Sequence, residues 1–156
     1  MTRALAISIF VALCGVASAD MTDGAVPAEQ IKPLVPHKLG GVEPYQALDY
    51  PWAVAIAYKL PDGHYANLDI QNTFHRSTHD TTLEDLNNKS PSSMCPKKET
   101  ISGYVACVKI GDGSASIRWY LPDRLTVRVA APTEDTVRKM AADLPIAKLA
   151  ALSAKK

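Results

Sequence analysis

The sequence predicts a single α+β domain, in which an antiparallel five-stranded sheet carries a C-terminal helix, and a short N-terminal helix, on one face. Residues 101–131 are β-prone segments separated by glycine and proline turns. Residues 52–71 form two further alternating segments around Asp62-Gly63, a hairpin signal. After Pro132 the apolar spacing becomes helical. The expected strands are residues 52–58, 65–71, 101–110, 114–121 and 124–131.

The first of these strands has unusually different faces. Large side chains occupy one side, and the small side chains of residues 53, 55 and 57 occupy the other. A sheet face made of alanine is typical of a strand on which a helix packs closely. We therefore expect the alanine face to lie under the covering helix. Residues 42–50, just before it, are expected to form a weak strand or an extended lead-in.

The C-terminal helical region is expected to cover residues 133–152. Thr133 has the properties of an N-cap, and Glu134 and Asp135 follow in the first turn, where the helix dipole favours acidic groups. Asp143 is expected to cap a second helical segment that contains Pro145 near its start. A short N-terminal helix is expected within residues 27–35.

The first 19 residues read as an export signal. Arg3 precedes an apolar run, and Ala17-Ser18-Ala19 resembles a signal-peptidase site, so we expect cleavage after Ala19. A lipid anchor on Cys14 is disfavoured because Leu13 replaces the small residue that such processing needs. The expected organisation is a signal peptide (1–19), a flexible mature N-terminus (20–26) and one domain (27–153). The expected location is periplasmic or secreted.

Cysteine usage agrees with export. Once Cys14 leaves with the leader, Cys95 and Cys107 form an even pair in an oxidising compartment. No Cys-x-x-Cys spacing is present, which favours a structural disulfide over a redox pair. This bridge would tether the end of residues 72–98, a polar insert rich in Ser, Thr and Asn.

The charge balance favours neither nucleic acid nor an anionic membrane as a partner. The chain has 17 basic and 16 acidic residues, and the predicted leader contains one of the basic ones. A mature chain with no net charge gives no signal for nucleic acid. The sequence also contains no further apolar segment of membrane-spanning length.

The chain resembles a set of small, uncharacterised exported proteobacterial domains with PsbP-like α/β character. The resemblance rests on Leu39-Gly40-Gly41, Leu68-Asp69-Ile70 and Asp123 to Val129, followed by Asp143 to Leu149. These motifs are turns and core positions, so the resemblance implies a fold and no activity. The polar 72–98 insert and the cysteines depart from the family pattern.

One pair of side chains has metal-ligand spacing. His75 and His79 would share a face if residues 75–79 were helical, as a zinc site requires. Arg76 occupies the position where the zinc-protease motif needs a glutamate, and the intervening residues are poor helix formers. A solvated loop is the favoured interpretation, with metal binding as an alternative.

No catalytic signature is present. His64 lies at a predicted hairpin tip and lacks the partner and pocket that a general base needs. Ser93 has Pro96, and not lysine, three residues later, so the serine–lysine spacing is missing. We expect neither enzymatic activity nor a cofactor.

The sequence therefore predicts an exported, non-enzymatic binding or accessory protein, with another periplasmic protein as its partner. The first alternative is a periplasmic inhibitor or immunity-type protein, and the second is a metal-binding protein. We expect the interaction surface within residues 72–98 and the adjoining sheet edge. Its candidate residues are Phe74, Arg76, Tyr120, Arg124 and Arg128, because an exposed face with arginine and tyrosine binds acidic partners or planar ligands.

Overall fold

A computed structural model describes residues 24–51, 53–72, 95–122 and 124–154 of the chain. Seven antiparallel strands form one sheet within these residues, in the order β1-β2-β3-β7-β6-β5-β4. The strands are β1 (Pro44–Tyr50), β2 (Ala53–Lys59), β3 (Tyr65–Asn72), β4 (Lys97–Ile101), β5 (Tyr104–Gly111), β6 (Ser114–Tyr120) and β7 (Leu125–Ala131). The helices are α1 (Ala28–Ile31), which continues into the 3-10 turn η1 (Lys32–Leu34), then α3 (Glu134–Ala142) and α4 (Ile146–Ser153).

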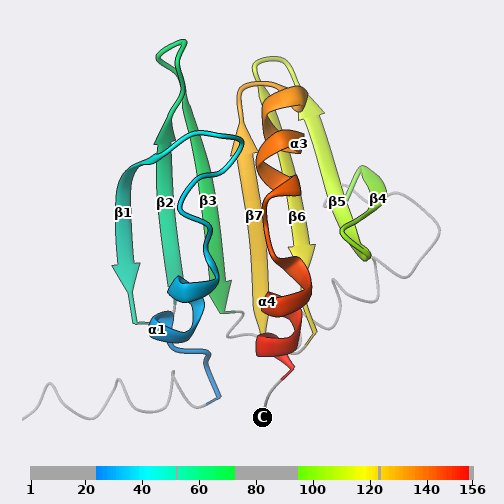
Figure 1. Ribbon diagram of the computed structural model, residues 1–156. Coiled ribbons are helices and arrows are strands. Elements are labelled where there is room, and N and C mark those ends of the chain that lie inside the picture. The colour runs from blue at the N-terminus through cyan, green and yellow to red at the C-terminus, as the bar shows by residue number, and fades with distance from the viewer. Residues whose placement is uncertain (1–23, 52, 73–94, 123, 155–156) are drawn as a thin grey trace, which may run out of the picture.

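The described helices lie on one face of the sheet (Figure 1). The α+β class, the antiparallel sheet and the C-terminal helices are thus confirmed. Thr133 is the N-cap of α3, since its side chain accepts a hydrogen bond from the Thr136 N–H at 3.2 Å. No described helix is long and apolar enough to cross a membrane.

The number of strands was predicted incorrectly, because the sheet has seven strands and not five. The expected strand 101–110 is interrupted by a hairpin turn at Ser102 and Gly103, whose φ angles are 54° and 81°. Residues before this turn form β4 and those after it form β5. The weak segment 42–50 contains β1, which pairs with β2 regularly from Gln46 to Tyr50 after a register shift between Pro44 and Gln46.

The helix-covered face was also predicted incorrectly for β2. Val54, Ile56 and Tyr58 belong to the main core cluster that includes the buried residues of α3 and α4, whereas the alanines at 53, 55 and 57 do not. The large side chains therefore lie on the helix side of the sheet, where β2 contacts α1. The alanines face the opposite side.

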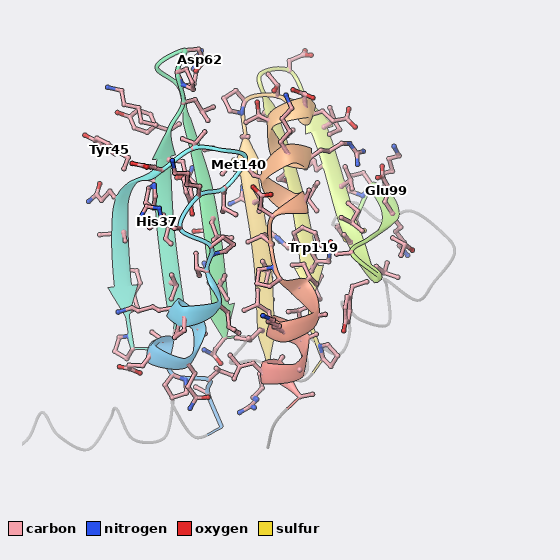
Figure 2. The ribbon with its side chains drawn as sticks, in the orientation of Figure 1. His37, Tyr45, Asp62, Glu99, Trp119 and Met140 are labelled. Carbon is pink, nitrogen blue, oxygen red and sulfur yellow. A yellow bond between two sulfur atoms is a disulfide. The ribbon has the colours of Figure 1, made fainter. Side chains whose placement is uncertain are left out.

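Trp119 of β6 is the largest fully buried side chain in the core. It lies under the helix layer (Figure 2), and its indole N–H donates to the carbonyl of Ile101 at 3.3 Å. Apolar residues of β2, β3, β6 and β7 continue the same face on either side of it. One core therefore joins both halves of the sheet to α3 and α4.

The loop before β1 is fixed against the end of α3. The Gly40 N–H donates to the Asp143 carboxylate at 2.7 Å. Gly40 has a φ of 58°, and a Cβ there would lie 3.0 Å from Met140. Asp143 was expected to cap the second helical segment, but Pro145 occupies that position and makes no side-chain cap. The Asp143 carboxylate instead holds a distant loop.

A buried serine joins the last helix to the start of β7. Ser153 Oγ accepts hydrogen bonds from the N–H groups of Arg124 (3.1 Å) and Leu125 (2.9 Å), and donates to the Pro122 carbonyl. We expect Ser153→Ala to lower the free energy of unfolding by about 2 kcal/mol, because a buried donor would lose its acceptor. Urea unfolding followed by circular dichroism would measure this loss.

The matched control is Ser116→Ala, which removes a half-buried hydroxyl on the other side of the sheet. A surface change of this kind alters stability by no more than about 0.5 kcal/mol. Equal losses for the two variants would contradict the structural role of Ser153.

Candidate functional site

The sheet face that the described helices leave uncovered is the candidate site, and we call it the open face. Its members are defined by strand register and alternate with the core residues. They are Gln46, Leu48 and Tyr50; residues 53, 55, 57 and 59; Tyr65, Asn67, Asp69 and Gln71; Thr126, Arg128 and Ala130; Ser114, Ser116, Arg118 and Tyr120; Val105, Cys107 and Lys109; Lys98 and Thr100.

Basic groups are concentrated on this face. Among the open-face residues just named, Asp69 is the one acidic residue, against five basic residues. The basic residues are Lys59, Lys98, Lys109, Arg118 and Arg128. The whole chain is nearly balanced, with 17 basic and 16 acidic residues. Charge is therefore segregated in the fold, and the open face should carry a positive potential that attracts acidic groups.

Register aligns an acidic and two basic residues in the middle of the face. Asp69 pairs with Arg128 across β3 and β7, and Arg128 pairs with Arg118 across β7 and β6. Arg128 Nη1 lies 3.7 Å from Asp69 Oδ2, while the Arg128 Nε is buried and has no hydrogen-bond partner in the described part of the chain. Burial raises the pKa of Asp69, although Arg128 and Arg118 oppose that shift. One carboxylate thus partly balances two guanidinium groups.

The disulfide positions the second arginine through a tyrosine. Cys95 and Cys107 are bonded, with a Cα–Cα distance of 5.0 Å, which confirms the predicted bridge. Tyr120 packs against the two cysteines. Arg118 Nη1 donates to the Tyr120 hydroxyl at 3.1 Å, and its guanidinium carbon lies 5.9 Å from the ring centroid. A covalent link at the sheet edge therefore supports the orientation of Arg118.

The β1 side of the open face carries exposed apolar and aromatic side chains, joined there by Tyr45 at the irregular start of β1. Tyr45 and Tyr65 have ring centroids 5.6 Å apart. Tyr45 is 60% exposed, Leu48 48%, Tyr50 49% and Tyr65 49%. We call these four residues the apolar strip. Figure 2 labels Tyr45 at the β1 side of the sheet. The residues of β2 beside the strip are alanines, so the larger side chains of the strip project beyond their neighbours.

The hairpin end of the open face has a shallow hollow of about 630 Å³. Its lining includes His64 and Tyr65 from the β2–β3 hairpin, Lys109 and Ser116 from β5 and β6, and Arg128 from β7. No three His, Cys, Asp or Glu side chains in the described ranges form a group that could hold a metal ion. The hollow is wide and open, which suits contact with a protruding group of a partner.

The predicted site residues are distributed over different places. Phe74, Arg76, His75 and His79 lie outside the described residues, as does most of the 72–98 insert. Tyr120 and Arg128 lie together on the open face. Arg124 lies elsewhere, because its guanidinium donates to the carbonyls of Gly24, Leu152 and Ser153 at 2.6, 3.3 and 3.0 Å. Arg124 therefore binds the C-terminal end of α4, where unpaired carbonyls favour a cation.

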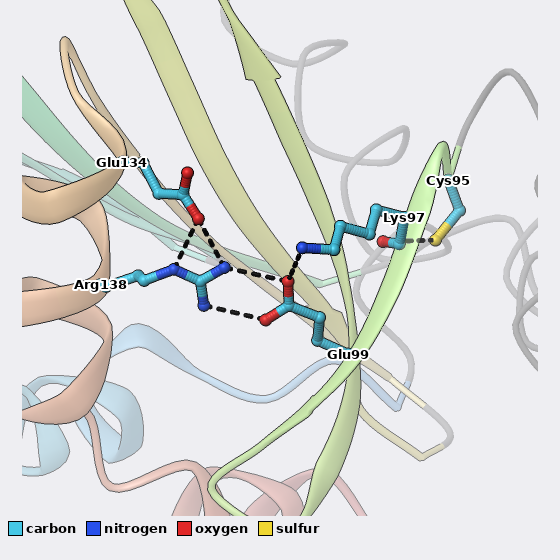
Figure 3. A network of polar contacts seen from close by, with 5 residues as sticks. All are labelled: Cys95, Lys97, Glu99, Glu134 and Arg138. Carbon is cyan, nitrogen blue, oxygen red and sulfur yellow. Dashed lines mark hydrogen bonds and ion pairs between the residues drawn. The ribbon is translucent and has the colours of Figure 1, made fainter.

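An ionic network fixes the β4 edge to the helix layer (Figure 3). Arg138 donates to both carboxylate oxygens of Glu99 at 2.9 Å and to Glu134 at 2.8 Å, while Lys97 lies 2.7 Å from Glu99. The hydrogen bonds from Arg138, then from Lys97, lower the pKa of Glu99 to about 2. The Glu99 side chain is 22% exposed and that of Arg138 37%, so water screens the network and its contribution is modest.

This network should make the free energy of unfolding depend on pH in the acid range. The pKa of Glu99 is lower in the folded protein than the value of about 4.3 in an unfolded chain, so the stabilisation is present at neutral pH and is lost as the pH falls toward 2. We expect Glu99→Gln to lower the free energy of unfolding by about 1 kcal/mol at pH 7. The difference from wild type should shrink steadily in urea unfolding below pH 4.

Glu43→Gln is the control, because Glu43 forms an ion pair with Lys38 in which both side chains are more than half exposed. Its effect at pH 7 should be smaller. A Glu99→Gln deficit that stays constant from pH 7 to the acid limit would contradict the assigned pKa.

Comparison with known proteins adds no family, since no family model, curated protein or solved structure matches the chain. The resemblance to exported proteobacterial domains therefore stays a prediction. Of the open face, the sequence indicated Tyr120 and Arg128, but not Lys59, Lys98, Lys109 or the apolar strip. Alternation along β2 and β5 was the signal that could have found Lys59 and Lys109, whereas β1 and β4 carry no clear alternation.

Proposed function

We propose that this chain is an exported, non-enzymatic binding or accessory protein that acts in the periplasm and binds an acidic protein partner through its open face. The observation that carries the proposal is the segregation of five basic residues and one acidic residue onto one sheet face. The even pair of cysteines, joined in a disulfide, supports an oxidising location.

The apolar strip favours a protein as the partner. Exposed tyrosines beside arginines are typical of protein interfaces, where aromatic and arginine side chains contribute most of the binding energy. A partner surface with carboxylates opposite Arg118 and Arg128, and apolar side chains opposite the strip, would match both halves of the face. The same face would serve an inhibitor or immunity-type protein, and the identity of the partner would distinguish the two.

The test is capture of a partner from the periplasmic fraction of the native cell by the tagged protein. We expect one stoichiometric acidic protein to be retained by wild type. Arg118→Gln combined with Arg128→Gln should reduce its retention at least about tenfold, since charge pairs at interfaces contribute both affinity and association rate. Raising the salt concentration should weaken capture by wild type in the same way.

Lys139→Gln combined with Lys148→Gln is the matched control. It removes two exposed basic residues from α3 and α4, and so changes the net charge equally on the opposite side of the molecule. This control should retain the partner. Equal retention by both double variants, or no stoichiometric partner at all, would contradict the proposal.

A further inference from the structure

The two edges of the sheet differ in how they are protected. Proteins commonly block edge strands with lysine, proline or a covering element, because the unpaired backbone of an edge can pair with another strand. β4 carries Lys97, Lys98 and Glu99, and is held by the disulfide and by Arg138. β1 contains no lysine or arginine. The two edges therefore present very different surfaces to another chain.

In β1, proline and an irregular register protect only the first residues, and Asp49 is the one charged residue farther along. Pro44 begins the strand, and the register with β2 shifts between Pro44 and Gln46. From Gln46 to Tyr50 the pairing with β2 is regular, which leaves five residues of straight edge. Leu48 and Tyr50, two members of the apolar strip, are on this stretch. A regular edge with exposed apolar side chains is the arrangement that accepts another strand.

A second copy of this chain fits the edge. Its β1 brings the same edge, which pairs with no other strand among the described residues, so antiparallel pairing about a two-fold axis satisfies both edges at once. An axis through Leu48 places this residue beside the partner's Leu48, and places Tyr50 beside the partner's Gln46. No two like charges are then directly opposed, and the cross-strand apolar contact lies on the open face.

We propose that two copies of this chain pair antiparallel through β1, with the two-fold axis at Leu48. The sheet becomes continuous across both copies, and the two apolar strips join at its centre with a basic region on either side. This inference rests on the β1 edge and is independent of the proposed function, because it needs no second kind of protein.

The first test is the mass of the full chain, purified after export, by sedimentation equilibrium over a range of concentrations. We expect a reversible dimer. Leu48→Lys should raise the dissociation constant by at least about tenfold, because two ammonium groups would face each other across the axis. Circular dichroism and the melting temperature of the variant confirm that its monomer is folded.

Ile110→Lys is the matched control. Ile110 is 47% exposed, against 48% for Leu48, and lies on β5 beyond the end of β4. This variant should dimerise like wild type. If the protein stays monomeric up to about 200 μM, its dimer is too weak to form through this edge, and the proposal is overturned. A dimer that survives Leu48→Lys overturns it as well.

The second test reports the axis directly. Directly opposed residues in antiparallel strands have Cβ atoms about 4.5–5.5 Å apart, close enough for a disulfide after small adjustment. Leu48→Cys should therefore give a covalent dimer under mild oxidation, while Ile110→Cys should not. Wild-type Cys95 and Cys107 are already bonded and do not interfere. Failure of Leu48→Cys to cross-link a dimeric protein overturns the assigned axis.

Discussion

Replacing Trp119 by alanine should lower the free energy of unfolding by about 3–5 kcal/mol, the largest effect expected for one residue of this chain. The side chain is fully buried, and its N–H is hydrogen-bonded to Ile101. The variant would leave a cavity at the point where β6 meets the helix layer, together with an unpaired carbonyl at the end of β4. Urea unfolding monitored by circular dichroism would measure the loss.

Tyr65→Ala is the control for this prediction, because it removes an aromatic side chain that is half exposed on the open face. Its cost should be about 1 kcal/mol or less. If Trp119→Ala does not fold, Trp119→Phe keeps most of the packing and should show an intermediate loss. Similar losses for Trp119→Ala and Tyr65→Ala would contradict the placement of the buried core on the helix-covered face of the sheet.

The second large effect concerns the disulfide. Cys95→Ser combined with Cys107→Ser should lower the free energy of unfolding by about 3 kcal/mol, because the bridge joins residues 12 positions apart and restricts the unfolded chain. The melting temperature should fall by roughly 10 °C for a domain of this size. Thermal unfolding of wild type and variant would measure the shift.

Thiol titration under denaturing conditions provides the control. Protein purified after export should contain no free thiol, provided that Cys14 is removed with the leader. Two reactive thiols in such material, or an unchanged melting temperature in the double variant, would contradict the structural role of the bridge.

The sequence predicted the strands that have one buried face. In β3, β6 and β7 apolar and polar residues alternate, and burial follows this alternation. β1 was expected only as a weak strand or an extended lead-in, and β4 was not separated from β5, because edge strands need no apolar face. In β4 no residue is fully buried, so its sequence KKETI carries no amphipathic signal. Its existence depends on pairing with β5, which is a long-range property of the fold.

The covered face of β2 was a different kind of error. The alternation itself was read correctly, but it cannot say which of two unequal apolar faces meets the helices. That choice depends on which element covers β2: this strand contacts α1, and Tyr58 and Ile56 belong to the same buried cluster as Ile31 of α1. The packing volume depends on all the elements together, so the sequence of one strand cannot show which of its faces is covered.

The candidate site was predictable only in part, because the net charge of the chain does not say which face of the sheet each charged residue occupies. Seventeen basic and sixteen acidic residues indicate nothing until the strands separate them. Arg128 and Tyr120 were assigned outward from alternation, which holds within strands. Arg124 lies in the turn before β7, where alternation fails, and its side chain reaches the end of α4.

The Arg124 contacts also constrain the order in which the fold can close during synthesis. Its guanidinium bonds simultaneously to Gly24 and to Leu152 and Ser153, so early and late parts of the chain share one binding group. Val26, just after Gly24, is paired in turn with Asn72 at the end of β3. A ribosome must therefore release almost the entire sequence before this junction can form. This junction therefore forms late, after the rest of the sheet is available for pairing.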